Sequence, residues 1–488
     1  MTDALPPQPP VRDAQDQPGR EVPQDSRDQW DLPGQQDMPA QEDLPAQEDL
    51  PDQQDLHDLK AAARARMLRR RRRTVVSGLL VLALGAASYT VAVAAAELPA
   101  LEGTLSVAEE AQYEADASAL EAGINAQALP SAAGWAHDDE VWANTGEPQP
   151  IASITKLVTA LVGQAANPLE PVSDGFTHVW TSADRKRQSE LIALDGIAFP
   201  VPVGSEYTQR QMLELMLLPS ANDFAQSYAY AIFGDNTGFL AAVGEWKSTH
   251  GLDTLTIVEP SGMDAGNQAS PADLVRIARL ALADPTLSEI VRMQSTEIPG
   301  IGIVESTNPL LGADPGVIGL KTGRLFTSGF NLLAAQTSET SGRALVKISV
   351  SLGRPTASDR VASSREMLAL LEGQPQSVDI LVEGEEAGSL VTWTGGTVSL
   401  VASEASAAVL VPGESASRAI TLTPLSAPTE GIAPANTVVG EWITTTPNGE
   451  QRVAVVTTES ITEPDLWWRL THPTIVFGWA DPQANTEA

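Results

Sequence analysis

The 488-residue sequence contains no cysteine, which excludes disulfide bonds, thiol catalysis and zinc sites built from thiolates. It also contains only five histidines, and none of them is spaced as one of a pair of metal ligands. We therefore expect no metal, no other cofactor and no metallopeptidase activity. Positive charge is scarce as well, because 30 Lys and Arg face 63 Asp and Glu and leave a formal net charge of −33. Nucleic acid is accordingly not expected as a partner.

Residues 1–60 contain little that could form a hydrophobic core. An Asp-Leu-Pro or Asp-Met-Pro triplet recurs every six residues from Asp31 to Pro51, separated by Gln-rich spacers. Regularly spaced proline prevents a continuous helix, and the acidic side chains repel one another. We expect this segment to be a disordered, acidic cytoplasmic tail.

A basic segment, residues 61–74, reverses the sign of the charge and ends in an unbroken run of arginines from Arg69 to Arg73. Residues 75–96 follow without a charged side chain and are long enough to cross a bilayer as one helix. Because arginines flank only the N-terminal side, they predict a single-pass protein of the cell membrane, with a cytoplasmic N-terminus and the rest of the chain outside. A cleaved signal peptide is the alternative, indicated by the small residues 92–96.

An apolar segment from Pro150 to Val162 carries a serine and a lysine three residues apart. Leucines recur at helical spacing after them, so Ser153 and Lys156 should share one face near the first turn of a helix. The free N–H groups at such a helix end stabilise negative charge that develops on an attacked carbonyl. This arrangement predicts Ser153 as a nucleophile whose hydroxyl the Lys156 side chain can reach.

Two further short motifs follow in the chain. Ser220 and Asn222 come directly after a periodic apolar segment that stops at Pro219. An apolar strand then ends in Lys321, Thr322 and Gly323. In this order, Ser-x-x-Lys, Ser-x-Asn and Lys-Thr-Gly resemble the signature of the penicillin-recognising serine enzymes.

The resemblance is closest to D-alanyl-D-alanine carboxypeptidases of the low-molecular-mass penicillin-binding group, and it covers roughly residues 97–372. The segments Met216 to Asp223 and Asn308 to Leu311 also resemble that family. It implies an α+β domain with the serine β-lactamase/DD-peptidase fold, in which helices flank a five-stranded antiparallel sheet. Near the start of this range, residues 108–122 are rich in Ala and Glu and predict a polar helix.

The resemblance also implies roles for individual residues. Ser153 would form the acyl-enzyme, and Ser220 would relay a proton between the amines and the leaving group. The base would be a neutral lysine, and the sequence leaves open whether Lys156 or Lys321 is the neutral one. Asn222 would orient Lys156 and the substrate amide, and the oxyanion would bind the backbone N–H groups of Ser153 and Arg324. The implied substrate-binding residues are Asn222, Lys321, Thr322, Gly323, Arg324 and Arg360.

This sequence departs from the family in two places. Leu325 replaces the Thr or Ser that usually stands two places after Lys-Thr-Gly, which removes one expected hydrogen bond to substrate. The arginine that binds the substrate carboxylate corresponds to Arg354 or Arg360, with a loop of slightly different length, and we favour Arg360.

The residue pattern of the sequence changes after residue 373. Residues 374–464 contain several short apolar strands separated by Gly and Pro, which predicts a small C-terminal β domain. Residues 465–488 are aromatic but too short to cross a membrane. This tail either touches a membrane interface or packs against the β domain.

The sequence therefore predicts a membrane-anchored serine D-alanyl-D-alanine carboxypeptidase. Its expected partners are peptidoglycan stem peptides ending in D-Ala-D-Ala, β-lactam inhibitors and the cytoplasmic membrane. One alternative is a serine β-lactamase with Glu259 as an added base, although Met263 stands where the customary Asn of that loop would fall. The others are a DD-endopeptidase and a non-enzymatic penicillin-binding wall protein.

Overall fold

The computed structural model describes residues 53–480, so residues 481–488 and most of the predicted acidic tail, residues 1–52, lie outside the described part. The first element is one continuous helix, α1 (Gln53–Ala95). Residues 53–60 are therefore helical, contrary to the prediction of disorder, because no proline interrupts the chain between Pro51 and Pro99. Within α1, residues 61–95 are long and apolar enough to cross a membrane.

The chain divides after Gly85 into two units, and the second unit contains both of the larger sheets. One of these sheets has five strands in the order β11-β12-β13-β3-β4, and every neighbouring pair is antiparallel. Its strands are β3 (Ser131–Trp135), β4 (Trp142–Ala143), β11 (Val317–Leu325), β12 (Gly329–Thr340) and β13 (Arg343–Arg354). This antiparallel sheet and the helices around it confirm the predicted α+β fold.

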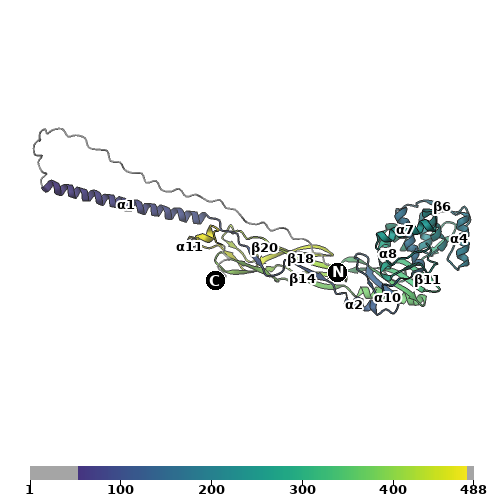
Figure 1. Cartoon of the computed structure of the whole chain (residues 1–488). Helices are drawn as coiled ribbons and strands as arrows, with labels where there is room; N and C mark the ends of the chain where they lie inside the picture. Colours follow the sequence, from purple (N-terminus) through teal and green to yellow (C-terminus); the bar gives the residue numbers. More distant parts are fainter. Residues whose placement is uncertain (1–52, 481–488) are drawn as a thin grey trace, which may run out of the picture. The chain divides into compact units, whose positions relative to one another are not determined.

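Helices cover both faces of the five-stranded sheet. Successive side chains of a strand point to opposite faces, so neighbouring leucines of β12 enter different cores. Leu333 joins the core that contains α8 (Pro271–Ala283), whereas Leu332 packs in the core that contains α10 (Ala357–Glu372). Figure 1 shows α8 and α10 in the same part of the molecule as β11. We refer to residues 118–372 as the α+β domain.

The other helices of the α+β domain include α3, which is buried along most of its length and packs against η1, α5, α6, α7 and α8. These helices are α2 (Ser118–Asn125), the 3₁₀ helix η1 (Ala152–Ile154), α3 (Thr155–Ala166), α4 (Ser182–Ala193), α5 (Gln209–Leu217), α6 (Asn222–Phe233), α7 (Asn236–Thr249) and α9 (Pro285–Val291). Three short antiparallel ladders connect them, namely β5 (Gln149–Pro150) with β8 (Gln268–Ala269), β6 (Thr177–Val179) with β7 (Glu206–Thr208), and β9 (Ser295–Ile298) with β10 (Gly302–Glu305).

The second sheet has seven strands in the order β1-β15-β16-β21-β20-β18-β2. These strands are β1 (Gly103–Leu105), β2 (Glu110–Glu114), β15 (Glu386–Val391), β16 (Thr397–Ala402), β18 (Ser415–Leu422), β20 (Val438–Thr446) and β21 (Gly449–Thr457). Two small ladders accompany the sheet, β14 (Gln376–Leu381) with β17 (Ser406–Leu410) and β19 (Ile432–Ala433) with β22 (Ile461–Thr462). We call β1, β2 and residues 376–462 together the β domain.

The β domain takes residues from both sides of the α+β domain, which corrects two predictions. Residues 97–114 belong to it and not to the catalytic range predicted to begin at 97, because β1 pairs with β15 and β2 pairs with β18. The predicted helix over residues 108–122 is also wrong for residues 108–117. In its place the chain forms β2 and then α2, since pairing with β18 outweighs the helix propensity of Ala and Glu.

Two short helices, α11 (Leu466–Thr471) and α12 (Pro473–Val476), follow the β domain. They contact the last turns of α1, where the Tyr89 hydroxyl donates to the Leu470 carbonyl over 2.8 Å. Val93 of α1 and Val476 of α12 are buried in the same core as the β-domain strands. Part of the aromatic tail is therefore packed, whereas Trp467 and Trp479 remain 74% exposed.

The central position of β12 gives a test of the core. We expect Leu333→Ala to lower the free energy of unfolding of the α+β domain by about 2–5 kcal/mol, because Leu333 is fully buried and its truncation leaves a cavity. Urea unfolding followed by circular dichroism measures the change. The matched control Leu194→Ala removes a leucine that is 67% exposed and should leave the unfolding midpoint in place. Equal midpoints for the two variants would contradict this description of the core.

Candidate active site

Ser153 lies in η1, immediately before α3. It is the only residue between Ile151 and Gln164 that is not buried, so its side chain faces outward from an otherwise enclosed segment. The preceding residue, Ala152, has a φ of +52°, a conformation that an L-residue adopts only at a cost of roughly 1–3 kcal/mol. The Thr155 hydroxyl stabilises this turn by donating to the Ala152 carbonyl over 2.7 Å. The strained turn presents Ser153 at the beginning of α3.

Lys156 lies in the first turn of α3 with its side chain fully buried. Its Nζ is 3.0 Å from the Ser153 Oγ and donates to the Ser261 carbonyl over 2.6 Å. Burial lowers the pKa of Lys156 to about 7, although the negative charges of Glu259 and Asp223 oppose that shift. A large fraction of Lys156 is therefore neutral near neutral pH, as a base for the Ser153 hydroxyl must be.

Lys321 is the second buried lysine of the site and lies on β11. Its Nζ donates to the Thr322 carbonyl over 3.3 Å. Burial lowers the pKa of Lys321 well below its ordinary value, and the positive charges of Lys156 and Arg360 lower it further. The structure thus brings the lysines of the first and third motifs together with an arginine from α10.

The second motif lies in the turn between α5 and α6. Ser220 has a φ of +69°, and its buried Oγ has no hydrogen-bond partner among the described residues. The Asn222 side chain accepts a hydrogen bond from the Ile197 N–H over 3.1 Å, while its buried Nδ2 has no partner in the same part of the chain. No hydrogen bond joins Asn222 to Lys156 in the described structure. The two unpaired polar atoms are free to bind a substrate.

Thr322 and Gly323 complete the third motif on β11. The Thr322 hydroxyl is 2.7 Å from the hydroxyl of Thr307, a residue that the sequence analysis did not select. A Cβ on Gly323 would lie 2.7 Å from the Ile151 carbonyl oxygen, so only glycine allows β11 to approach the Ser153 turn this closely. Thr307 directly precedes the Asn308 to Leu311 segment, which resembles the family. This position in the sequence was the only signal that could have identified Thr307 as a site residue.

The structure distinguishes the two candidate arginines. Arg354 is 3% exposed and donates to the Pro130 and Leu352 carbonyls and to the hydroxyls of Ser131 and Ser363, so it links strands and helix inside the fold. Its guanidinium is therefore already engaged by the protein itself.

Arg360 approaches the third motif instead. It donates to the Gly323 and Asn331 carbonyls over 3.3 Å, and its Nε has no partner among the described residues. Both Arg360 and the exposed Arg324 lie over the Phe330 ring, with guanidinium carbons 5.6 and 5.3 Å from the ring centre. Burial lowers the pKa of Arg360, and the nearby Arg324 lowers it further. A guanidinium therefore lies beside the Lys321 amine, which favours an anionic group on the substrate.

No group of three His, Asp or Glu side chains within residues 53–480 is placed to hold a metal ion. The chemistry of the described site is instead that of a hydroxyl, two buried amines and a guanidinium. This set can support nucleophilic attack on a carbonyl next to a bound carboxylate.

Comparisons with known proteins agree with that chemistry. A family model described as D-alanyl-D-alanine carboxypeptidase matches residues 141–356, a range that includes Ser153, Ser220 and Lys321. The chain is 31% identical over 224 residues to the D-alanyl-D-alanine carboxypeptidase DacB2 of Mycobacterium tuberculosis, covering 44% of this chain and 72% of that protein.

Two further similarities extend the comparison. The chain is 33% identical over 141 residues to a D-alanyl-D-alanine endopeptidase of Pseudomonas aeruginosa, covering 29% of this chain and 42% of that protein. Among solved structures, penicillin binding protein 5 from Haemophilus influenzae aligns with 20% identity and a TM-score of 0.46, over 68% of this chain and 97% of that one.

The lowered pKa of Lys156 predicts how the reactivity of Ser153 depends on pH. Since the neutral amine is the base, the rate of acylation by a fluorescent penicillin should rise about tenfold between pH 6 and pH 8, through a pKa of about 7. Lys156→Arg keeps the positive charge but cannot release a proton, so it should slow acylation by about 10²- to 10⁴-fold at every pH. A rise centred near pH 10 would mean that Lys156 is an ordinary, charged lysine.

Proposed function

We propose that this chain, which belongs to the D-alanyl-D-alanine carboxypeptidase family, removes the terminal D-alanine from peptidoglycan stem peptides through an acyl-enzyme on Ser153. Membership of the family makes the protein a serine-type hydrolase. The observation that carries the assignment of residues is the distance of 3.0 Å between the Lys156 Nζ, buried near Lys321, and the Ser153 Oγ.

The reaction begins when neutral Lys156 takes the Ser153 proton as the Oγ attacks the carbonyl of the penultimate D-alanine. The resulting oxyanion binds the backbone N–H groups of Ser153 and Arg324. The C–N bond then breaks, and the proton passes through Ser220 to the departing amine of the terminal D-alanine. Water then attacks the ester carbonyl and gives a proton to Lys156, which passes it to the Ser153 Oγ as the ester bond breaks and the shortened peptide leaves. The unpaired, buried Oγ of Ser220 supports its role as the proton relay.

Recognition of a free carboxylate distinguishes a carboxypeptidase from an endopeptidase. Arg360 supplies a positive charge, and the Lys321 amine and the Thr322 hydroxyl supply hydrogen-bond donors beside it, a combination that suits a terminal carboxylate. The Asn222 Nδ2, unpaired in the described structure, is available to the substrate amide. An endopeptidase acts on an internal bond, which has no terminal carboxylate to offset the burial of the Arg360 charge. The arrangement therefore favours the carboxypeptidase over the endopeptidase.

The β-lactamase alternative requires a second base that activates water against the acyl-enzyme. The sequence offers Glu259, but both oxygens of its carboxylate already accept hydrogen bonds from Ser261, Gly262 and Met263 in its own loop. A carboxylate engaged in this way has little capacity left to orient a water molecule. We therefore expect β-lactams to form a lasting ester on Ser153. Detection of this ester would also exclude the alternative of a non-enzymatic wall protein, because such a protein has no acylating site.

Substrate specificity gives the test of this proposal. The purified protein should release D-alanine from a pentapeptide ending in D-Ala-D-Ala and should be much less active when that terminus is amidated. Arg360→Ala should lower kcat/KM for the free peptide by about 10- to 100-fold, the cost of one charged hydrogen bond of about 1.5–3 kcal/mol. The surface variant Arg452→Ala is the matched control, since Arg452 pairs with Glu441 in the β domain. Equal rates on the free and amidated peptides would contradict the carboxypeptidase assignment.

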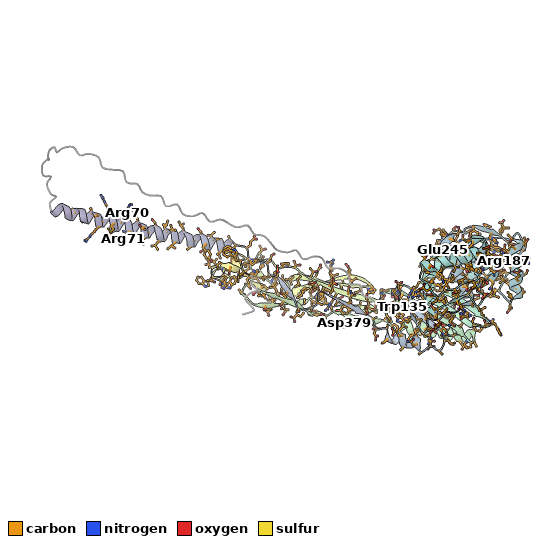
Figure 2. All side chains as sticks on the ribbon, viewed as in Figure 1. Arg70, Arg71, Trp135, Arg187, Glu245 and Asp379 are labelled. Carbon is orange, nitrogen blue, oxygen red and sulfur yellow. The ribbon has the colours of Figure 1, made fainter. Side chains whose placement is uncertain are left out.

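We further propose that α1 anchors the protein in the cytoplasmic membrane, with the α+β domain outside the cell. The arginines at the N-terminal side of the apolar stretch, including Arg70 and Arg71 in Figure 2, support this orientation. Retention of α1 after export is supported by its last turns, because Val93 is buried in the β-domain core and the Ala96 carbonyl accepts a hydrogen bond from Arg469. Cleavage by a signal peptidase near residues 92–96 would remove these contacts.

A chain without cysteine allows the topology to be tested with single introduced cysteines. Asp379→Cys, at an exposed position of the β domain labelled in Figure 2, should react with a membrane-impermeant maleimide on intact cells. Arg66→Cys, at an exposed position of α1, should react only after the membrane has been permeabilised. Equal labelling of both variants on intact cells, or a mature chain that begins after residue 96, would contradict the proposed anchor.

A further inference from the structure

A single carboxylate lies at the centre of the loop that holds the Lys156 amine. This loop, residues 258–267, connects α7 to β8 and is called the Glu259 loop below. One oxygen of Glu259 accepts from the Ser261 N–H over 2.7 Å and from the Ser261 hydroxyl over 2.6 Å. The other accepts from the N–H groups of Gly262 and Met263 over 2.5 and 2.8 Å. The Glu259 side chain thus supplies hydrogen-bond acceptors that these backbone N–H groups would otherwise lack.

Asn267 closes the loop from its other end. Its Nδ2 donates to the Glu259 carboxylate and to the Glu259 carbonyl, each over 2.9 Å, while its Oδ1 accepts from the Val258 N–H over 2.7 Å. The Asn267 carbonyl accepts from the Ile151 N–H over 3.0 Å, two residues before Ser153. The same loop is therefore tied to the segment that carries the candidate nucleophile.

Two backbone groups of the loop touch the reacting residues directly. The Ser261 carbonyl accepts from the Lys156 Nζ over 2.6 Å, a shorter distance than the 3.0 Å from that nitrogen to the Ser153 Oγ. Gly262, with a φ of +82°, packs so tightly on the Ser153 turn that a Cβ would lie 2.1 Å from the Ala152 carbonyl oxygen. A shift of the loop would therefore move the amine and the hydroxyl relative to each other.

From these contacts we propose that Glu259 is a positioning residue, whose carboxylate sets the place of the Ser261 carbonyl and through it the orientation of the Lys156 amine toward Ser153. This inference rests on the proposed acyl-enzyme on Ser153. Glu259 does not touch the Ser153 hydroxyl in the described structure, so its effect on the reaction passes through Lys156. It also differs from the β-lactamase alternative, in which the same carboxylate would act on water.

The replacement Glu259→Gln keeps the size of the side chain but changes its charge and its hydrogen bonds, so it tests whether the carboxylate itself positions the loop. Whichever oxygen becomes an amide NH₂, it would face the N–H of Ser261 or those of Gly262 and Met263, so a donor would meet a donor and the loop should shift. The replacement also removes a negative charge that raises the pKa of Lys156. The other charged groups facing that amine, Asp223 on α6 and Lys321 on β11, are unchanged.

The experiment measures the second-order rate of acylation of the full-length protein by a fluorescent penicillin between pH 5 and pH 10. For Glu259→Gln we expect a rate about 10- to 100-fold lower, the loss of one or two charged hydrogen bonds, with the acidic limb of the profile moved to lower pH. Glu259→Asp keeps the charge but is one methylene too short to reach both ends of the loop. The Glu259→Asp variant should be acylated about tenfold more slowly than the wild type, and the acidic limb of its pH–rate profile should not move. The control Glu245→Gln, at the exposed position on α7 labelled in Figure 2, should leave both quantities unchanged.

The possible outcomes separate this inference from the proposed function. If the wild-type protein is not acylated, the proposed function fails. If the wild type is acylated and Glu259→Gln reacts at the same rate with the same profile, only the positioning role is overturned. A slower Glu259→Gln with an unmoved limb and a lowered melting temperature would show that the carboxylate serves stability alone, which also overturns the proposal. Should Glu259→Gln fail to fold, Glu259→Asp decides, because a wild-type rate would reject the positioning role and a slow rate with an unmoved limb would support it.

Discussion

Burial of two lysines side by side is the constraint on which the rest of the site depends. Lys156 and Lys321 are both at most 1% exposed, and no carboxylate is paired with either by a salt bridge among the described residues. Water stabilises an ammonium ion far better than a protein interior does, so enclosure and mutual repulsion both favour loss of a proton. The fold maintains this unfavourable arrangement by placing one lysine on a central buried helix and the other on a strand of the five-stranded sheet, with Gly323 allowing the strand to come close.

Much of the site could be predicted from the sequence because its chemistry requires particular residue types at short spacing. A serine and a lysine three residues apart meet on one helical face, and the structure places their side chains 3.0 Å apart. The second and third motifs were recognised by their order along the chain. Their meeting in space, and the approach of Arg360 to Gly323, depend on contacts of β11 with η1 and α10 that no local pattern encodes. The sequence also left Arg354 and Arg360 as alternatives, and only their hydrogen-bond partners distinguish them.

Features that depend on pairing across long distances in the chain were missed. Residues 108–122 have the composition of a helix, yet β2 forms there because it pairs with β18. That partner lies about three hundred residues further along the chain, so no local pattern indicates it. The same long-range pairing places residues 97–114 in the β domain, so the α+β domain is inserted between two parts of that domain. Thr307, and the contact of the Glu259 loop with Lys156, escaped notice for a related reason. Each acts through a partner on another element, Thr322 and Lys156 respectively, and neither has a distinctive motif of its own.

The central claim is that about half of Lys156 is neutral near pH 7 in the folded protein, and a direct titration tests it. The chain has only six lysines, so ¹³C labelling at lysine Cε gives few NMR signals, and the Lys156 signal can be assigned as the one missing from Lys156→Arg. We expect this signal to titrate with a midpoint near a pKa of about 7. A midpoint close to the ordinary lysine value of 10.5 would contradict it, because a charged Lys156 cannot accept the Ser153 proton.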